Sequence, residues 1–181
     1  LLMNTVQAMM PFTDGLFINN LTNYAVTGAV TFSQPIISMV LGLSQGLSVA
    51  AMAIIGQLNG KGAIEEGKRV AAQIFLFAVM LGIISAPLLL IISVAVSRSL
   101  QSDIAPYVRQ YIAWYSIVLP FSFLESVYNG IKNANGKPEA AFTRMTILFL
   151  MKVVGNFLFL YMLRLEIIGC VLASLFANVC I

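Results

Sequence analysis

Three ionisable side chains lie inside apolar stretches that are long enough to cross a membrane: Asp14, Glu125 and Lys152. Charged groups are costly in hydrocarbon, and those that occur there usually pair with one another or line ion and substrate pathways. Burial favours the protonated form of a carboxylate, whereas a nearby cation or hydrogen-bond donor favours the charged form. A carboxylate balanced between these effects can bind and release a cation. Asp14 is the residue predicted to do so.

Neutral polar residues on three other predicted helices lie at about the depth of Asp14. Counted from the proposed outer helix ends, Asp14, Asn156 and Ser174 are each seven residues in, and Gln34 is about six. Seven residues correspond to roughly 10 Å of helix. Such a layer can satisfy one carboxylate and hold H⁺ or Na⁺. For each neutral residue taken singly, a polar network that only fixes helix packing is the alternative, but such a network rarely needs a full charge.

The other two ionisable residues and one proline are predicted as cavity or gating residues. Glu125 lies about six residues from the inner end of its helix, where water can reach it, and is interpreted as an inner-mouth or structural residue. Lys152 lies near the middle of its helix, and snorkelling, pairing with a carboxylate and facing a cavity are all open to it. Pro11 precedes Asp14 by three residues and could bend the first helix.

The composition places these residues on membrane-spanning helices. Of the 181 residues, 60% are hydrophobic and 9% are charged, and the mean hydropathy is +0.93. Soluble domains average about 45–50% apolar and about 25% charged residues. We therefore predict an all-α polytopic membrane protein in the lipid bilayer. The net charge of +3 is small, and the basic residues lie in short loops, which indicates membrane orientation rather than nucleic-acid binding.

Six apolar segments fit spanning helices, each of which needs about 20 residues. They cover approximately residues 1–21, 28–58, 70–96, 106–131, 139–163 and 167–181. The loops after the second and fourth segments carry more Lys and Arg than the opposite loops, which predicts that they are cytoplasmic and that the first helix runs outward. Both ends of the sequence lie in apolar runs, so we expect residues 1–181 to be a six-helix bundle truncated at both ends.

Little in the sequence favours an enzyme. There is no histidine, and no H-E-x-x-H, P-loop or nucleotide-binding glycine loop occurs. Cys170 and Cys180 are interpreted as buried helix residues rather than a disulfide or a redox pair. We therefore expect no catalytic residues, no cofactor and no metal site, with Na⁺ at Asp14 as an alternative to H⁺.

Aromatic residues gather near the proposed outer helix ends. Two interpretations are open: an interfacial belt, and an aromatic wall for a cationic ligand. The residues are Tyr24, Tyr107, Tyr111, Trp114, Tyr115 and Tyr161.

Several segments, in their order and spacing, resemble the multidrug and toxic compound extrusion (MATE) family of cation-coupled antiporters. "DGLFINNL" (14–21) is similar to the first helix of that family, and residues 35–73, with the Q-x-x-G of Gln57 and Gly60, are similar to its second helix and following loop. "NGIKNANGKPEAA" (129–141), "VVGNFLFLY" and "IIGCVLAS" resemble the later segments. The resemblance implies one six-helix lobe of a twelve-helix, two-lobe transporter, here the N-terminal lobe.

The resemblance also implies a cation site in this lobe. Asp14 matches the first-helix carboxylate of the family, Asn156 matches the asparagine of the polar cluster, and Ser174 falls where some members have threonine. Members with a second carboxylate carry it at the position of Leu160, so Asp14 would be the sole acid of the site. Asn19, where many members have glycine, is a second departure.

These observations predict a secondary active antiporter that exports organic cations or drugs in exchange for H⁺ or Na⁺. Its expected location is a bacterial inner membrane, and its expected partners are a small cationic substrate and the C-terminal six-helix lobe of the same full-length chain. A lipid-linked precursor flippase would share the helix count, but its cavity is expected to be more basic. A non-transporting membrane scaffold is the other alternative, although it would not need Asp14.

Overall fold

The described part of the chain is helical throughout. The computed structural model describes residues 13–18, 24–100, 103–163 and 165–179, and no strand occurs among them. Residues 13–18 form one helical segment. The other elements are α2 (Tyr24–Gly60), α3 (Ile64–Ser99), α4 (Ala105–Tyr115), α5 (Leu119–Ala134), α6 (Pro138–Asn156), the π-helix η1 (Phe157–Met162) and α7 (Glu166–Val179). The all-α prediction is confirmed.

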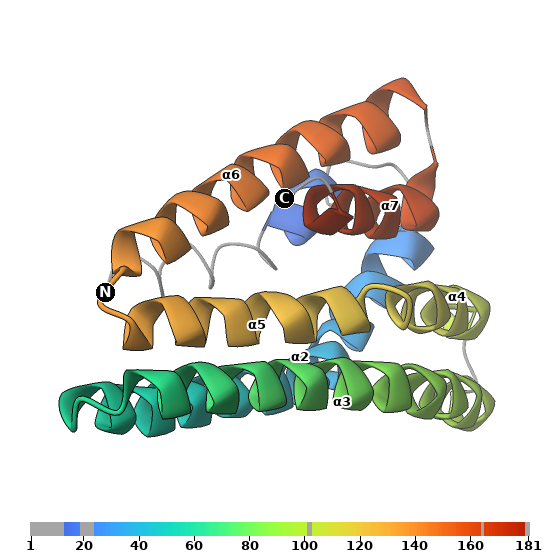
Figure 1. Cartoon of the computed structure of the whole chain (residues 1–181). Coiled ribbons are helices and arrows are strands. Elements are labelled where there is room, and N and C mark those ends of the chain that lie inside the picture. The colour runs from blue at the N-terminus through green and yellow to red at the C-terminus, as the bar shows by residue number, and fades with distance from the viewer. Residues whose placement is uncertain (1–12, 19–23, 101–102, 164, 180–181) are drawn as a thin grey trace.

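The helices form a wedge-shaped bundle (Figure 1). Long α2 and α3 lie along one edge, and α4 and α5 follow each other nearly end to end beside them. From the turn after α5, α6 diverges at an angle, and α7 packs against α6 and η1 in the wider end of the wedge. The larger buried core includes Val30, Leu89, Ile112 and Leu160, so it draws on α2, α3, α4 and η1.

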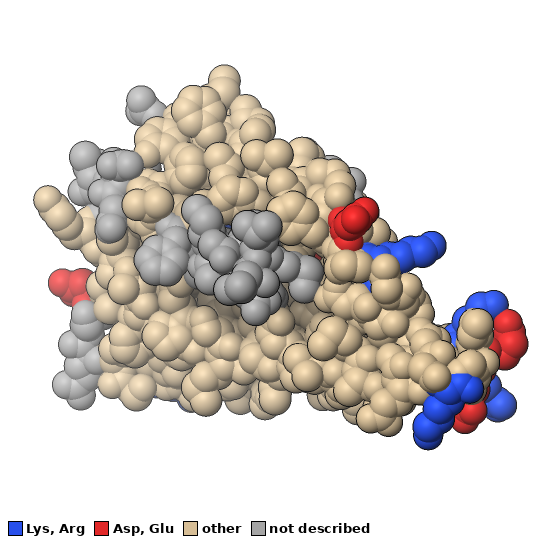
Figure 2. Space-filling model, turned by 90° about the vertical axis from the view of Figure 1, so that its left-hand side faces the viewer, with Lys and Arg blue, Asp and Glu red and all other residues tan. Residues whose placement is uncertain are grey.

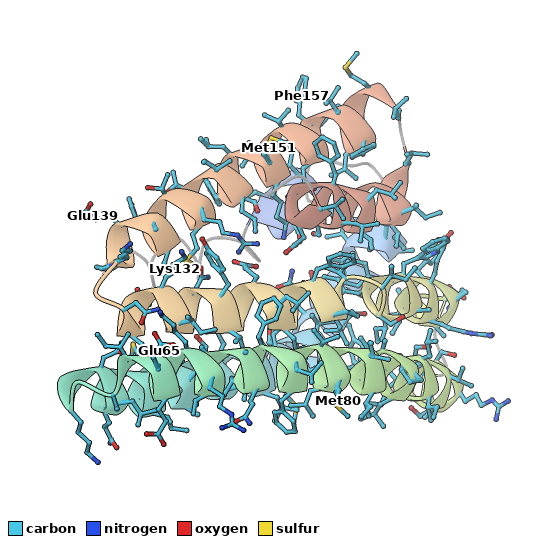
Figure 3. All side chains as sticks on the ribbon, in the orientation of Figure 1. Glu65, Met80, Lys132, Glu139, Met151 and Phe157 are labelled. Atoms are coloured by element: carbon cyan, nitrogen blue, oxygen red, sulfur yellow. The ribbon has the colours of Figure 1, made fainter. Side chains whose placement is uncertain are left out.

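The lengths and surfaces of the helices are those of a membrane protein. Three helical stretches, Tyr24–Gly60, Ile64–Ser99 and Pro138–Met162, are long and apolar enough to cross a bilayer, and Ile167–Val179 is a shorter apolar helix. Large apolar side chains cover the outside of the bundle. Met80 on α3 and Phe157 at the start of η1 point away from it and are 53% and 55% exposed (Figure 3). A soluble protein rarely exposes such continuous apolar surface, so these faces meet lipid or another protein surface.

Most of the charged side chains visible in Figure 2 gather at one end of the bundle, and few lie on the rest of the described surface in that view. The α2–α3 turn and the α5–α6 turn contact each other at one end of the bundle. Asn59 Nδ2 donates to the Ala134 carbonyl (3.1 Å) and to Asn135 Oδ1 (2.9 Å). Gly62 and Gly136 supply the positive φ angles of 75° and 69° that these turns require. The two basic loops therefore lie on the same side, as the positive-inside prediction requires.

The single helix predicted over 106–131 is wrong. The structure has α4 and α5, separated by a three-residue turn at 116–118. Pro120 has no N–H to donate to the carbonyl four residues earlier, and its ring would crowd that carbonyl. The chain responds with tighter bonds: Ile117 N–H donates to the Trp114 carbonyl (3.1 Å) and Val118 N–H donates to the Tyr115 carbonyl (2.9 Å).

Glycines allow α5 and α6 to approach their neighbours closely. A Cβ at Gly130 of α5 would lie 2.4 Å from the backbone oxygen of Ser48 on α2. A Cβ at Gly155 of α6 would lie 3.1 Å from Cα and Cβ of Ala173 on α7. Small residues at such contacts let helix backbones meet in a membrane. The second contact sets the spacing of α6 and α7 beside Asn156 and Ser174.

Candidate functional site

The carboxylate of Asp14 is buried and makes two charge-assisted contacts to α6. Lys152 Nζ lies 2.9 Å from Asp14 Oδ2, and Asn156 Nδ2 donates to Asp14 Oδ1 at 2.9 Å. Asp14 is 3% exposed, Lys152 5% and Asn156 0%. The pairing of Lys152 with a carboxylate is thus observed, and it places a positive charge against the acid.

The α6 helix presents both partners because they are four residues apart. Residues i and i+4 lie one above the other on one face of an α-helix, so the side chains of Lys152 and Asn156 meet the same carboxylate. Asn156 is the last residue of α6, and the wider turns of η1 follow at once. Leu160 is buried in η1, so the position at which the family resemblance implies a second acid in some members contributes apolar packing here.

Asp14 opens onto a cavity of about 110 Å³ inside the bundle. The cavity draws residues from α2, α4, α5, α6 and α7, as well as from the first helical segment. Its lining is Asp14, Gln34, Ile37, Ser38, Leu41, Ser44, Gln45, Tyr111, Tyr115, Ser122, Glu125, Ser126, Leu148, Lys152, Ser174 and Asn178. Of the predicted site residues, the structure therefore brings Asp14, Gln34, Glu125, Lys152 and Ser174 to one cavity, with Asn156 behind the acid.

Ser174 and Asn156 differ in the hydrogen bonds that they offer Asp14. The Ser174 hydroxyl donates to the Cys170 carbonyl in its own helix at 3.1 Å. Asn156 donates from its amide nitrogen, while in the described part of the chain its Oδ1 is buried without a hydrogen-bond partner. A protonated Asp14 could donate to that oxygen, so Asn156 is suited to both charge states of the acid.

Sequence reasoning did not assign two cavity tyrosines. Tyr111 is 1% exposed and Tyr115 9%, and both line the cavity. Trp114, in contrast, is 41% exposed, and Tyr24 is 91% exposed. For Tyr111 and Tyr115 the aromatic-wall interpretation fits better than an interfacial belt. Their spacing of four residues on one helix face was the signal that separates them from Trp114.

Three residues singled out in the sequence lie outside the described residues, namely Pro11, Asn19 and Cys180. Cys170 is buried, as predicted. Among the described residues, no group of three or more His, Cys, Asp or Glu side chains could hold a metal ion. Glu125 also lines the cavity and gives it a second carboxylate, while the expectation that Asp14 is the sole acid of the cation site stays a prediction.

The charges around the cavity leave an unmatched negative charge. Asp14 and Glu125 carry two carboxylates, and Lys152 supplies one ammonium group, so the lining sums to −1 when all three are ionised. This charge balance, beside the rings of Tyr111 and Tyr115, favours a cationic group over an anionic one.

We expect Asn156→Ala to reduce ion-coupled transport by the full-length protein, but less than removal of the Asp14 charge does. The variant removes one donor to Asp14 Oδ1, worth about 1.5–3 kcal/mol for a bond to a charged group, and leaves Lys152 in place. Ser93→Ala on α3 is the matched control, since that buried hydroxyl bonds to its own helix and lies outside the cavity lining. Equal transport by Asn156→Ala and Ser93→Ala at matched expression would contradict the assigned role of Asn156.

Solved transporters share this fold. One is a MOP-superfamily transporter from Pyrococcus furiosus, described by a reverse polarity of its binding pocket that suggests a different function (TM-score 0.91, 21% identity). The match covers 99% of this chain and 40% of that transporter. MATE in the straight conformation gives a TM-score of 0.92 at 21% identity, with the same coverage of both chains. MATE in the bent conformation gives 0.90 at 22% identity, over 98% of this chain and 40% of that one.

The chain thus spans about 40% of the length of these solved transporters. Comparison with curated proteins gave no match. The MatE family profile matches residues 1–158, which is most of the chain. The chain therefore belongs to the MatE family, and it has the fold of one half of a twelve-helix MATE transporter.

Proposed function

We propose that the full-length protein is a secondary antiporter that exports monovalent organic cations in exchange for H⁺ or Na⁺. The observation that carries this proposal is the buried Asp14 carboxylate, held by Lys152 and Asn156 at the edge of a cavity with a surplus negative charge. The cavity gives a cationic substrate a place beside this carboxylate.

In the proposed cycle, Asp14 takes up the coupling ion from the outside while the substrate leaves. An ion can drive a conformational change only if it binds the two states of the transporter with different affinity. The ion pair with Lys152 provides such a difference, because a neutralised Asp14 no longer holds the ammonium group. The alternation would take place between this lobe and a C-terminal lobe of the same full-length chain, in a bacterial inner membrane.

The main alternatives are a lipid-linked precursor flippase and a non-transporting scaffold. The flippase is disfavoured by the cavity lining, in which Lys152 is the one basic residue among those described. A scaffold gives no reason for a buried ion pair open to a cavity, since apolar residues of similar size would pack at least as stably. We propose no enzymatic activity and no bound cofactor.

Reconstituted full-length protein provides the test. Proteoliposomes loaded with tetraphenylphosphonium, a monovalent organic cation, are given an inward H⁺ gradient or an inward Na⁺ gradient. We expect tetraphenylphosphonium to leave faster with one of the two gradients, and ions to enter with it. Efflux that responds to neither gradient, in vesicles whose protein is correctly folded, would reject the antiporter.

A further inference from the structure

We propose that Lys152 is a tethered counter-ion that moves from Asp14 to Glu125 when the coupling ion binds, and so displaces the cationic substrate from Glu125. This inference rests on the proposed antiport and assigns it a mechanism of exchange. It makes Glu125 the substrate-binding acid of the cavity and Lys152 the residue that links the two acids.

The placement of the three charges supports the exchange. Lys152 Nζ lies 2.9 Å from Asp14 Oδ2, and Glu125 lines the same cavity of about 110 Å³ from α5. The charge on Lys152 already acts on Glu125 across that space. A lysine ammonium sits on a flexible four-carbon stem, so it can change partners by rotation about side-chain bonds.

Glu125 is suited to receive either a substrate cation or Lys152. Within the part of the chain that the structure describes, no Lys or Arg nitrogen lies within 4.0 Å of the Glu125 carboxylate, whereas Asp14 has Lys152 at 2.9 Å. Tyr115 lines the cavity with Glu125, and its ring offers a face to an organic cation. Glu125 is therefore less buried than Asp14, and unlike Asp14 it has no lysine or arginine in salt-bridge contact among the described residues.

The exchange balances charge at each stage. With Asp14 ionised, Lys152 neutralises it and Glu125 is matched by one substrate cation. When a proton bonds to an Asp14 carboxylate oxygen, or Na⁺ binds there, Lys152 moves to Glu125 and the substrate cation leaves. One positive charge enters the site and one departs, so no uncompensated buried charge is created, which would be costly.

Other ionisable groups surround this pair. Tyr111 and Tyr115 face Asp14 from α4, and Cys170 faces it from α7. The charges of Arg144 and Lys152, both on α6, act on Glu125. Gln34 lines the cavity from α2. Arg144 also stacks on the Tyr128 ring at 5.0 Å, and it is not among the residues that line the cavity. A permanent Arg144–Glu125 partnership is the structural alternative that the test must exclude.

Binding of radiolabelled tetraphenylphosphonium to purified full-length variants tests the exchange. In Asp14→Asn, Lys152 has no partner at position 14 and should occupy Glu125, so binding should weaken about tenfold or more. Adding Lys152→Gln should restore binding to within about threefold of wild type, while the charge-preserving Lys152→Arg should not. Glu125→Gln should bind weakly in either background. Unfolding temperature and monodispersity must be matched for all variants.

Two results would overturn the exchange. One is an Asp14→Asn variant that binds tetraphenylphosphonium as tightly as wild type does. The other is an Asp14→Asn/Lys152→Gln variant that binds it no better than Asp14→Asn, in an experiment in which wild type binds. A second readout needs no substrate. In infrared difference spectra induced by acid or by Na⁺, the carboxylate band of Glu125 should shift when Asp14 is neutralised, and Lys152→Gln should lose that shift.

If wild type binds no tetraphenylphosphonium, the proposed substrate class fails and the infrared arm alone decides the exchange. A Glu125 band that does not move in wild type, or that still moves in Lys152→Gln, would overturn it. The bands are assigned by their loss in Asp14→Asn and Glu125→Gln.

Discussion

Asp14→Asn in the full-length protein is expected to abolish ion-coupled drug efflux, so that cells expressing it are as drug-sensitive as cells with an empty vector. The amide has nearly the shape of the carboxylate but neither takes up a proton nor carries a charge. In the structure it would leave Lys152 without the oxygen that now lies 2.9 Å away. Minimum inhibitory concentrations of cationic dyes, measured at matched expression, check this result.

The same substitution should leave most of the protein folded. Removing the carboxylate partner of a buried ammonium group costs about 3–5 kcal/mol, but Glu125 on the same cavity can accept Lys152 and offset part of that cost. Membrane-inserted protein should therefore be close to wild type in amount. Ser93→Ala, whose hydroxyl bonds within α3 and lies outside the cavity lining, serves as the control. Unchanged drug resistance in Asp14→Asn would remove the basis for a coupling role of this carboxylate.

Gly130→Ala is expected to cause the largest loss of stability among single methyl additions to the described helices. The new Cβ would lie 2.4 Å from the backbone oxygen and 2.8 Å from Oγ of Ser48, and the backbone atom cannot rotate away. The helices α2 and α5 would have to separate, at a cost of about 1–3 kcal/mol or more for an overpacked contact. Unfolding by heat or denaturant in detergent measures the change.

Gly56→Ala on α2 is the matched control. A Cβ there meets no atom within 4 Å among the described residues, and alanine is favoured over glycine in a helix by up to about 1 kcal/mol. The two identical chemical changes should therefore act in opposite directions. Equal unfolding midpoints for Gly130→Ala and Gly56→Ala would show that α2 and α5 do not pack as described.

Much of the fold could be predicted from the sequence because a bilayer imposes simple rules on helix length and apolarity. Runs of about 20 apolar residues mark spans whatever their neighbours are. The break between α4 and α5 was missed because a proline in a membrane helix often only bends it. At Pro120 the neighbouring contact is tight, since a Cβ at Gly82 would lie 2.7 Å from its Cα. Only the packed structure shows that contact.

The sequence predicts the depth of the candidate site in the membrane, but not which of its side chains contact each other. Counting residues from helix ends places Asp14 and Asn156 in one layer, and the structure joins them at 2.9 Å. The spacing of Lys152 and Asn156 already put both on one helix face. Which helix faces Asp14 depends on tertiary packing. The sequence therefore could not decide whether Lys152 snorkels, pairs with a carboxylate or faces a cavity. Glu125 was assigned to the inner mouth by depth, whereas the cavity extends from Asp14 to its side chain.

The most direct test of the central claim, that ion binding at Asp14 is coupled to substrate binding, is the linkage between the two affinities. Linkage requires that a coupling ion which expels the substrate also lowers the equilibrium affinity of the protein for that substrate. Tetraphenylphosphonium affinity of the purified full-length protein should be measured as pH is lowered and, separately, as Na⁺ is raised. The account predicts a fall of about tenfold or more with one of these ions in wild type and no response to it in Asp14→Asn. Wild-type affinity that responds to neither ion, or a response that persists in Asp14→Asn, would contradict it.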